Sequence, residues 1–205
     1  GFSTNFSFKL ALARYSLDQP IYPRTGSSFL ASAQFTPPYS LFNKNQTDYQ
    51  NFKLPEFTKF RLNSEWYIPI GKALGADKSR QFVLKAAVKY GFMGRYNSKM
   101  DYSPFERFQL GDAGLTNNFG LLGYDIISQR GYPVYQNSDP RVNPDQQSAS
   151  EFFIMFNKYT LELRYPFTTS PSSTIYGEMF FEAAHGWYDY RDYNPFRLRR
   201  GAGVG

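Results

Sequence analysis

The chain has a single histidine, His185, and residues near it could supply acid–base chemistry. Glu182 and Asp189 lie three and four residues away, so either carboxylate could orient the imidazole as a general base. Such a pair needs a nucleophile or a metal, and neither a Gly-x-Ser-x-Gly elbow nor metal-ligand spacing accompanies it. We therefore expect a structural histidine and a protein that is not an enzyme.

Other reactive residue types give no stronger signal. The sequence has no cysteine, which excludes thiolate chemistry and disulfides. Gly111–Gly114 and Gly201–Gly205 lack the following Lys-Ser/Thr of a phosphate-binding loop, and we interpret Asp18, Asp112 and Asp125 as turn or loop residues. The net charge of +6 is spread along the chain, so nucleic acid is not an expected partner. No metal or cofactor is expected.

The composition favours β-structure with two different faces. Aromatic residues make up 20% of the 205 residues, with 21 Phe and 17 Tyr, yet the mean hydropathy is negative. No apolar run approaches the roughly 18 residues of a transmembrane helix. A polar chain this rich in rings indicates either a soluble β-sandwich or a barrel with a polar lumen and an apolar outer band.

Alternation with a period of two is clearest between residues 82 and 92. Phe82, Leu84, Val88 and Tyr90 share one parity, whereas Lys85 and Lys89 share the other. About ten residues of such alternation suffice for a tilted strand to cross a hydrocarbon core. We predict that the apolar set, together with Leu161 and Leu163, faces lipid. Lys85, Lys89, Glu162, Arg164 and Glu182 are predicted to face the lumen.

The pattern predicts about seven strands. Further alternating stretches begin near Phe6, Phe29, Phe60, Tyr159 and Ile175, and a last strand begins near Leu198. The connections alternate in length: those around 17–26, 71–78 and 168–173 are short, and those around 37–56, 94–150 and 185–195 are longer. Short periplasmic turns and long external loops are typical of outer-membrane barrels, which favours a transmembrane antiparallel β-barrel over the sandwich.

The segment from 94 to 150 contains motifs that resemble a known loop. Phe105-Glu106-Arg107-Phe108, Leu110-Gly111, Gly114-Leu115 and Gln129-Arg130-Gly131-Tyr132 occur in this order. They are similar to a loop of the BamA family of outer-membrane assembly proteins, which folds back into the barrel lumen. In that family the tip reads Val/Ile-Arg-Gly-Phe/Tyr, so Gln129 departs from the pattern.

The following strand extends the resemblance. The family carries Phe-x-Asp-x-Gly-x-x-Trp there, and Phe180, Glu182 and Trp187 match it in spacing while Ala184 replaces the glycine. Further matches are Tyr22-Pro23-Arg24-Thr25-Gly26-Ser27, Leu161-Glu162-Leu163-Arg164-Tyr165-Pro166 and Asn194-Pro195-Phe196 followed by Arg200-Gly201-Ala202-Gly203. The matches cover nearly the whole chain in the family's order.

The resemblance implies that residues 1–205 are part of a barrel of sixteen strands. Family members carry periplasmic POTRA domains before the barrel, and we expect these and the final strands to lie outside this segment. An open sheet of seven strands would leave unpaired edges in lipid, which a bilayer does not tolerate.

The resemblance also implies a contact within the lumen. The tip of the loop, Gln129, Arg130, Gly131 and Tyr132, would meet Glu182 and Trp187 of the later strand. Glu182 has the inward parity, and a guanidinium could bind its carboxylate through two parallel hydrogen bonds. We predict that Arg130 and Glu182 are partners, and that removing the arginine costs about 1–3 kcal/mol.

The function implied by the resemblance is that of an insertase in the bacterial outer membrane. It would work without a cofactor, with accessory lipoproteins, periplasmic chaperones and unfolded outer-membrane proteins as partners. Alternatives are a TamA-like or two-partner secretion translocator, a passive pore, and a soluble sugar-binding sandwich.

Overall fold

The computed structural model describes residues 5–42, 54–74, 80–96, 102–103, 106–112, 125–134, 136–137, 149–150, 152–170 and 173–205. Phe105, Gly114 and Leu115 of the loop motifs lie outside these residues. Among the described residues, no helix is long and apolar enough to cross a bilayer.

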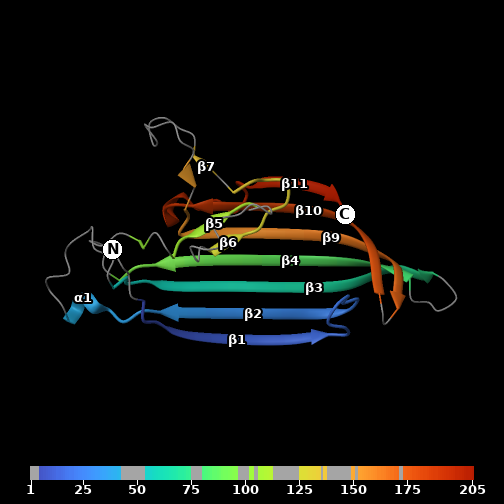
Figure 1. Ribbon diagram of the computed structural model, residues 1–205, viewed down its shortest axis with the longest axis horizontal. Helices are drawn as coiled ribbons and strands as arrows, with labels where there is room; N and C mark the ends of the chain where they lie inside the picture. The colour runs from blue at the N-terminus through green and yellow to red at the C-terminus, as the bar shows by residue number, and fades with distance from the viewer. Residues whose placement is uncertain are drawn as a thin grey trace.

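Seven antiparallel strands form one curved sheet, in the order β1-β2-β3-β4-β9-β10-β11 (Figure 1). These strands are β1 (Phe8–Leu17), β2 (Gly26–Phe35), β3 (Thr58–Leu74), β4 (Arg80–Gly94), β9 (Met155–Ser170), β10 (Ser173–Trp187) and β11 (Arg199–Val204). A helical turn, α1 (Tyr39–Phe42), follows β2, and a 3-10 turn over Tyr190–Asp192 precedes β11. This confirms the predicted antiparallel architecture.

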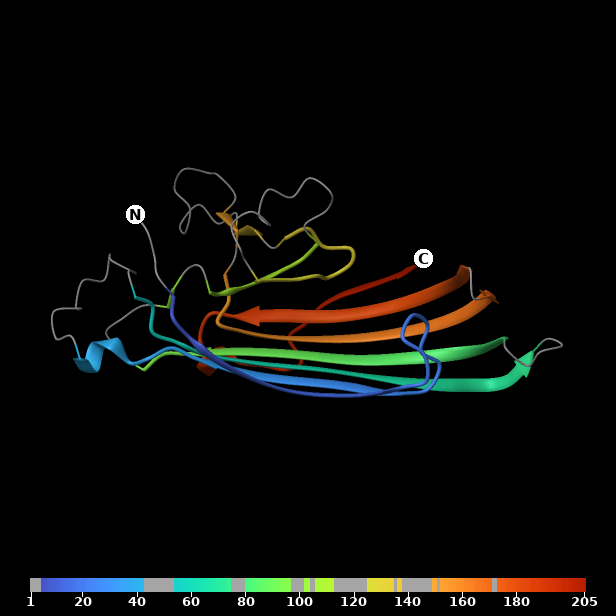
Figure 2. The same cartoon turned by 60° about the horizontal axis from the view of Figure 1, so that its bottom comes forward.

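The described residues of the long connection between β4 and β9 include four short strands. They are β5 (Phe108–Leu110) and β6 (Asp125–Ile127), which pair in parallel, and β7 (Gln136–Asn137) and β8 (Ala149–Ser150), which pair antiparallel. The sheet curves toward the side that carries β5 and β6 (Figure 2). We call this side the inner face and the opposite side the outer face.

Side chains alternate between the two faces as the sequence predicts. In β4, Val83 and Met93 on the inner face are fully buried, whereas Phe82 and Phe92 on the outer face are 42% and 37% exposed. Leu161, of β9, is also exposed on the outer face, whereas Glu162 is buried on the inner face. An exposed apolar outer face next to a charged, buried inner face is the arrangement of a barrel in lipid.

Aromatic side chains form two bands on the outer face. Near the long loops, Phe60 packs against Phe35 and Phe92, and near the short turns Phe82 packs against Tyr165. In β4 the bands lie ten residues apart, from Phe82 to Phe92, or roughly 33 Å along the strand at about 3.3 Å per residue. A strand tilted by about 40° converts this length to roughly 25 Å, the height of the apolar band of an outer-membrane barrel.

Several strands extend beyond their predicted ends. The short connections predicted at 71–78 and 168–173 are shorter still, because β3 continues to Leu74 and β9 to Ser170. Gly71, the first residue of a predicted turn, lies instead at an irregularity of the ladder. Gly71 has φ +78° where the register shifts, and Pro166 pairs with Tyr176 beside another shift. Such positions tolerate residues that weaken a regular strand.

Candidate functional site

The connection between β4 and β9 is packed onto the inner face by an apolar cluster. Phe108 and Leu110 of β5 are fully buried, and the Phe108 ring lies 4.8 Å from that of Phe156 on β9. Gly91 leaves room for this packing, because a Cβ atom there would lie 2.2 Å from the Phe156 ring. Burying side chains of this size contributes about 1.5–3 kcal/mol each, so the connection is held against the sheet.

Ion pairs attach the same connection to β3. Lys59 lies 3.2 Å from Asp125 of β6 and 3.5 Å from Glu106, and its ammonium donates to the Glu106 carbonyl. Arg61 also pairs with Asp125. Lys59 is 3% exposed, so its charge is balanced inside the protein. Asp125, expected to be a loop residue, therefore serves as an anchor to the sheet.

The tip of the connection is a tight turn that aims Arg130 at β10. Gly131 has φ +83°, a left-handed conformation that favours glycine. The backbone N–H of Arg130 donates to Glu182 Oε2 at 2.8 Å, and its Nε donates to Oε1 at 3.0 Å. This is the contact between Arg130 and Glu182 that the sequence predicts.

Arg130 also contacts two carboxylates that sequence reasoning did not assign to it. Its Nη2 donates to Glu162 of β9 at 2.6 Å, and its Nη1 donates to Glu178 of β10 at 2.5 Å. The guanidinium carbon lies 3.8 Å from the centre of the Phe180 ring. One guanidinium therefore joins three carboxylates from two adjacent strands while resting on an aromatic face.

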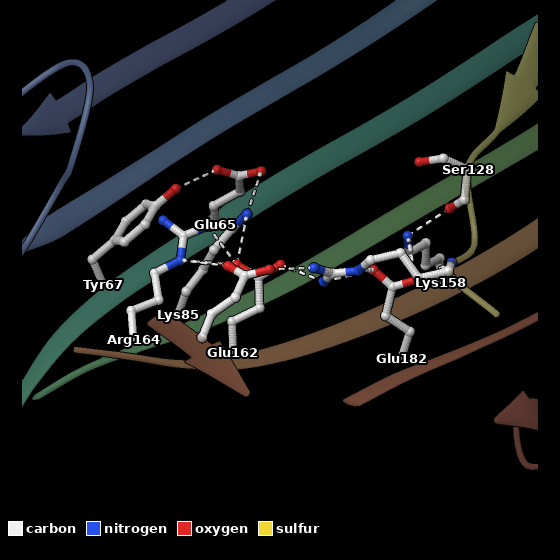
Figure 3. Close-up of polar contacts among 10 residues, drawn as sticks. Glu65, Tyr67, Lys85, Ser128, Lys158, Glu162, Arg164 and Glu182 are labelled. Atoms are coloured by element: carbon white, nitrogen blue, oxygen red, sulfur yellow. Dashed lines mark hydrogen bonds and ion pairs between the residues drawn. The ribbon is translucent and has the colours of Figure 1, made fainter. Parts of the chain in front are cut away.

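Further ion pairs continue this cluster across the inner face (Figure 3). Lys85 lies 3.5 Å from Glu162 and 4.0 Å from Glu65, and Arg164 pairs with Glu162 and Glu178. At the other end, Lys158 lies 3.1 Å from Glu182 and donates to the Ser128 carbonyl. We call the eight residues of this ion-pair cluster the clamp: Glu65, Lys85, Arg130, Lys158, Glu162, Arg164, Glu178 and Glu182.

The charge balance of the clamp explains why it binds the loop. Its four carboxylates all come from strands, whereas only three of its four cations do. Arg130 supplies the fourth cation from the loop. Glu162 and Glu182 are 5% and 3% exposed, and buried carboxylates are costly without a partner. Docking of the loop tip therefore neutralises the clamp.

The residues beside Arg130 dock on β11. Gln129 is fully buried and donates from its amide to the Arg199 carbonyl at 2.8 Å, and Tyr132 donates from its hydroxyl to the Arg200 carbonyl at 2.7 Å. Gly201 makes room for the tip, since a Cβ atom there would lie 2.9 Å from the Arg130 carbonyl oxygen. Gln129 thus has a structural use although it departs from the family pattern.

Trp187 lies away from the clamp, contrary to its expected place beside Glu182. Five residues separate the two, and an odd separation along a strand puts side chains on opposite faces. The Trp187 ring packs against His185 and against Tyr193, at centroid distances of 4.9 Å in both cases. Glu178 could have been added to the site from the sequence, because it lies on the same strand as Glu182 and shares its inward parity. The place of Glu162 beside them depends on the register between β9 and β10.

The clamp keeps the charge of Arg130 fixed. Burial alone would lower the pKa of Arg130, but hydrogen bonds and charges from Glu162 and Glu182 raise this pKa above its usual value. The guanidinium therefore stays charged and cannot act as an acid or base near neutral pH. Among the described residues, no three or more His, Cys, Asp or Glu side chains are grouped so that they could hold a metal ion.

The fold and the clamp together define a class of protein: a membrane-type β-sheet whose inner face is covered by a long, ion-paired loop. Comparison with known families places the chain within this class. The Omp85 superfamily domain matches residues 1–205, so the chain belongs to the Omp85 superfamily. This family points to the bacterial outer membrane.

The structure is also similar to a solved one. It matches the crystal structure of BamA from Haemophilus ducreyi lacking POTRA domains 1-3, with a TM-score of 0.65 and 16% sequence identity. The match covers 97% of this chain and 35% of that one, so the chain spans about a third of the BamA chain. At this identity the likeness shows a shared fold. No curated protein sequence matches the chain.

Proposed function

We propose that this chain is part of the insertase core of the outer-membrane β-barrel assembly machinery, which folds and inserts other barrel proteins. The observation that carries the proposal is the loop tip held by Arg130 against Glu162, Glu178 and Glu182. A loop clamped across the wall narrows the lumen, which supports this role over that of a pore that only conducts solutes. Membership of the Omp85 superfamily supports the same choice.

The proposed mechanism uses backbone pairing and no chemical reaction. An unfolded substrate strand would add to an exposed strand edge of the barrel, where main-chain hydrogen bonds give affinity for many sequences. The edges β1 and β11 of this sheet would themselves pair with further strands of the same barrel, because lipid does not tolerate unpaired backbone groups. The seam that opens to substrates would therefore lie beyond these seven strands.

The clamp would keep the wall rigid and the lumen closed while the seam opens. Partners in this function are the lipid bilayer, accessory lipoproteins of the assembly machinery, periplasmic chaperones and unfolded outer-membrane proteins. The second candidate is a TamA-like or two-partner secretion translocator of the same superfamily, which the superfamily match favours equally.

Depletion in the native host separates these functions. The full-length gene is placed under a repressible promoter, and outer-membrane barrel proteins and secreted proteins are quantified after repression. We expect a general loss of folded barrel proteins, and its rescue by the wild-type gene or by Arg191→Ala, since Arg191 is exposed and outside the clamp. Loss of one secreted protein alone would indicate the translocator, and a loss of solute uptake alone would indicate the pore.

A further inference from the structure

A polar pocket of about 370 Å³ lies at the end of β10, outside the clamp. Its lining includes His185, Trp187, Tyr188, Asp192, Arg197 and Arg199. This end of β10 leads into the long connection to β11. The pocket therefore lies at the end of the strands that we assign to the cell exterior.

Two of the described lining residues carry a buried nitrogen atom that lacks a hydrogen-bond partner. Trp187 is 3% exposed, and no described residue accepts a hydrogen bond from its Nε1. The Nδ1 atom of His185 is also buried and unpartnered in the described part of the chain. A buried donor without an acceptor costs about 1–3 kcal/mol. Because the indole N–H can only donate, the pocket calls for a ligand with an acceptor atom.

The charges around the pocket favour an anionic acceptor. Among the described lining residues, Arg197 and Arg199 are cationic and Asp192 is anionic. Arg197 is exposed, so its guanidinium is accessible to a ligand from outside. Planar guanidinium groups bind phosphate oxygens through two hydrogen bonds, which suits a phosphate group better than a carboxylic ester or a sugar hydroxyl.

An apolar groove of about 530 Å³ begins beside this pocket on the outer face. Leu10, Leu12, Ala31, Phe92, Met155 and Tyr193 are among its lining residues. Tyr193 connects the two spaces, because its ring packs on Trp187. The small Ala31 side chain leaves a hollow between larger ones, and this hollow has the apolar character of an acyl-chain site.

Exposed rings around the pocket match a membrane interface. Tyr190 and Phe196, on the connection between β10 and β11, are 57% and 82% exposed. Aromatic side chains are enriched at the boundary between headgroups and hydrocarbon. The connection therefore combines arginines, which would meet headgroups, with rings that would enter the lipid.

We propose that the pocket and the groove together bind one phosphate-bearing lipid of the outer leaflet. Arg197 and the Trp187 Nε1 hold the phosphate group, and an acyl chain lies in the groove as far as Leu10. The proposed lipid site requires only that the protein lies in the outer membrane, and it is independent of the insertase function. Either proposal can therefore fail while the other stands.

Native mass spectrometry of the full-length protein in detergent tests this site. The delipidated protein is titrated with dioleoyl phosphatidic acid, and the apparent Kd is measured for the wild type and for three variants. Arg197→Gln should weaken binding by about tenfold, the loss of one charge-assisted contact. Trp187→Phe keeps an aromatic ring but loses the donor, and should weaken binding several-fold. Arg191→Gln removes the same charge from the same connection outside the pocket, and should leave binding within about twofold.

Two further ligands separate the contributions of phosphate and acyl chain. Dioleoylglycerol has the same chains without the phosphate and should bind about tenfold more weakly than phosphatidic acid. Inorganic phosphate should not displace phosphatidic acid at equal concentration. Equal binding of dioleoylglycerol, displacement by inorganic phosphate, or equal losses in Arg197→Gln and Arg191→Gln would each overturn the proposal. Arg197 is exposed, so its variant decides the outcome even if Trp187→Phe fails to fold.

Discussion

At the scale of single residues, Arg130 shows what an arginine can do that a lysine cannot. Its guanidinium and backbone N–H together reach Glu162, Glu178 and Glu182 through four hydrogen bonds. The three carboxylates point at one place from two strands, so they repel one another unless a cation lies between them. The planar guanidinium donates hydrogen bonds to all three carboxylates from its different edges. The ammonium of a lysine is a compact point charge and cannot do this.

The first prediction concerns removal of this cation. Arg130→Ala should lower the free energy of unfolding of the full-length protein by about 3–5 kcal/mol, because it leaves buried carboxylates uncompensated. This is more than expected for a single pair. Urea unfolding in detergent, followed by heat-modifiable migration on gels, measures the change. Arg130→Lys should recover part of the loss, and full recovery would show that net charge alone holds the loop. The exposed Arg191→Ala is the control.

A second prediction concerns the room that β11 leaves for the loop tip. Gly201→Val adds a side chain where a Cβ atom alone would lie 2.9 Å from the Arg130 carbonyl oxygen. The tip should be displaced, and limited proteolysis of the intact barrel should then cut the loop faster than in the wild type. Ala202→Val is the matched control, since residue 202 lies on the outer face of the same strand. Equal proteolysis of both variants would contradict the docking of the tip on β11.

At the scale of elements, strand β4 separates a face toward lipid from a face toward the clamp. Leu84 pairs in register with Leu163, and the next residue, Lys85, pairs with Glu162. The ladder therefore joins apolar neighbours on one face and opposite charges on the other, and both arrangements stabilise an antiparallel pair.

Cysteine labelling of β4 provides the third prediction. In cells, a membrane-impermeant maleimide should react poorly with Leu84→Cys, because lipid covers the outer face. Lys85→Cys should react in protein whose loop has been loosened by Arg130→Ala. Equal labelling of Leu84→Cys and Lys85→Cys in that background would contradict a lipid-facing outer face.

Sequence reasoning predicted the faces of the strands better than their ends. A period of two depends only on neighbours along the chain, which is why Leu84 and Lys85 were assigned to the correct faces. The strand ends depend on irregularities such as the one at Gly71, where the ladder continues through residues that usually mark turns. The partners of Arg130 depend on the register between β9 and β10, which parity alone does not give.

At the scale of the whole molecule, the open sheet is a curved wall with an apolar outer face and an inner face to which the long loop is attached. The apolar cluster around Phe108, the anchor at Lys59 and the clamp at Arg130 hold the loop at separate places on this wall. Because it is attached at three separate places, the loop is held rigidly against the sheet. Under the proposed function, the barrel would open at a distant seam while this loop stays in place.

The rate at which the full-length protein folds a substrate tests this claim most directly. The protein is reconstituted into liposomes, an urea-unfolded outer-membrane barrel protein is added with a periplasmic chaperone, and its folding is followed by heat-modifiable migration. We predict faster folding than in empty liposomes, a loss of about tenfold for Arg130→Ala, which corresponds to about 1.4 kcal/mol in the barrier, and an unchanged rate for Arg191→Ala. Folding no faster than in empty liposomes would contradict the insertase function, and an unchanged rate for Arg130→Ala would contradict the role of the clamp in it.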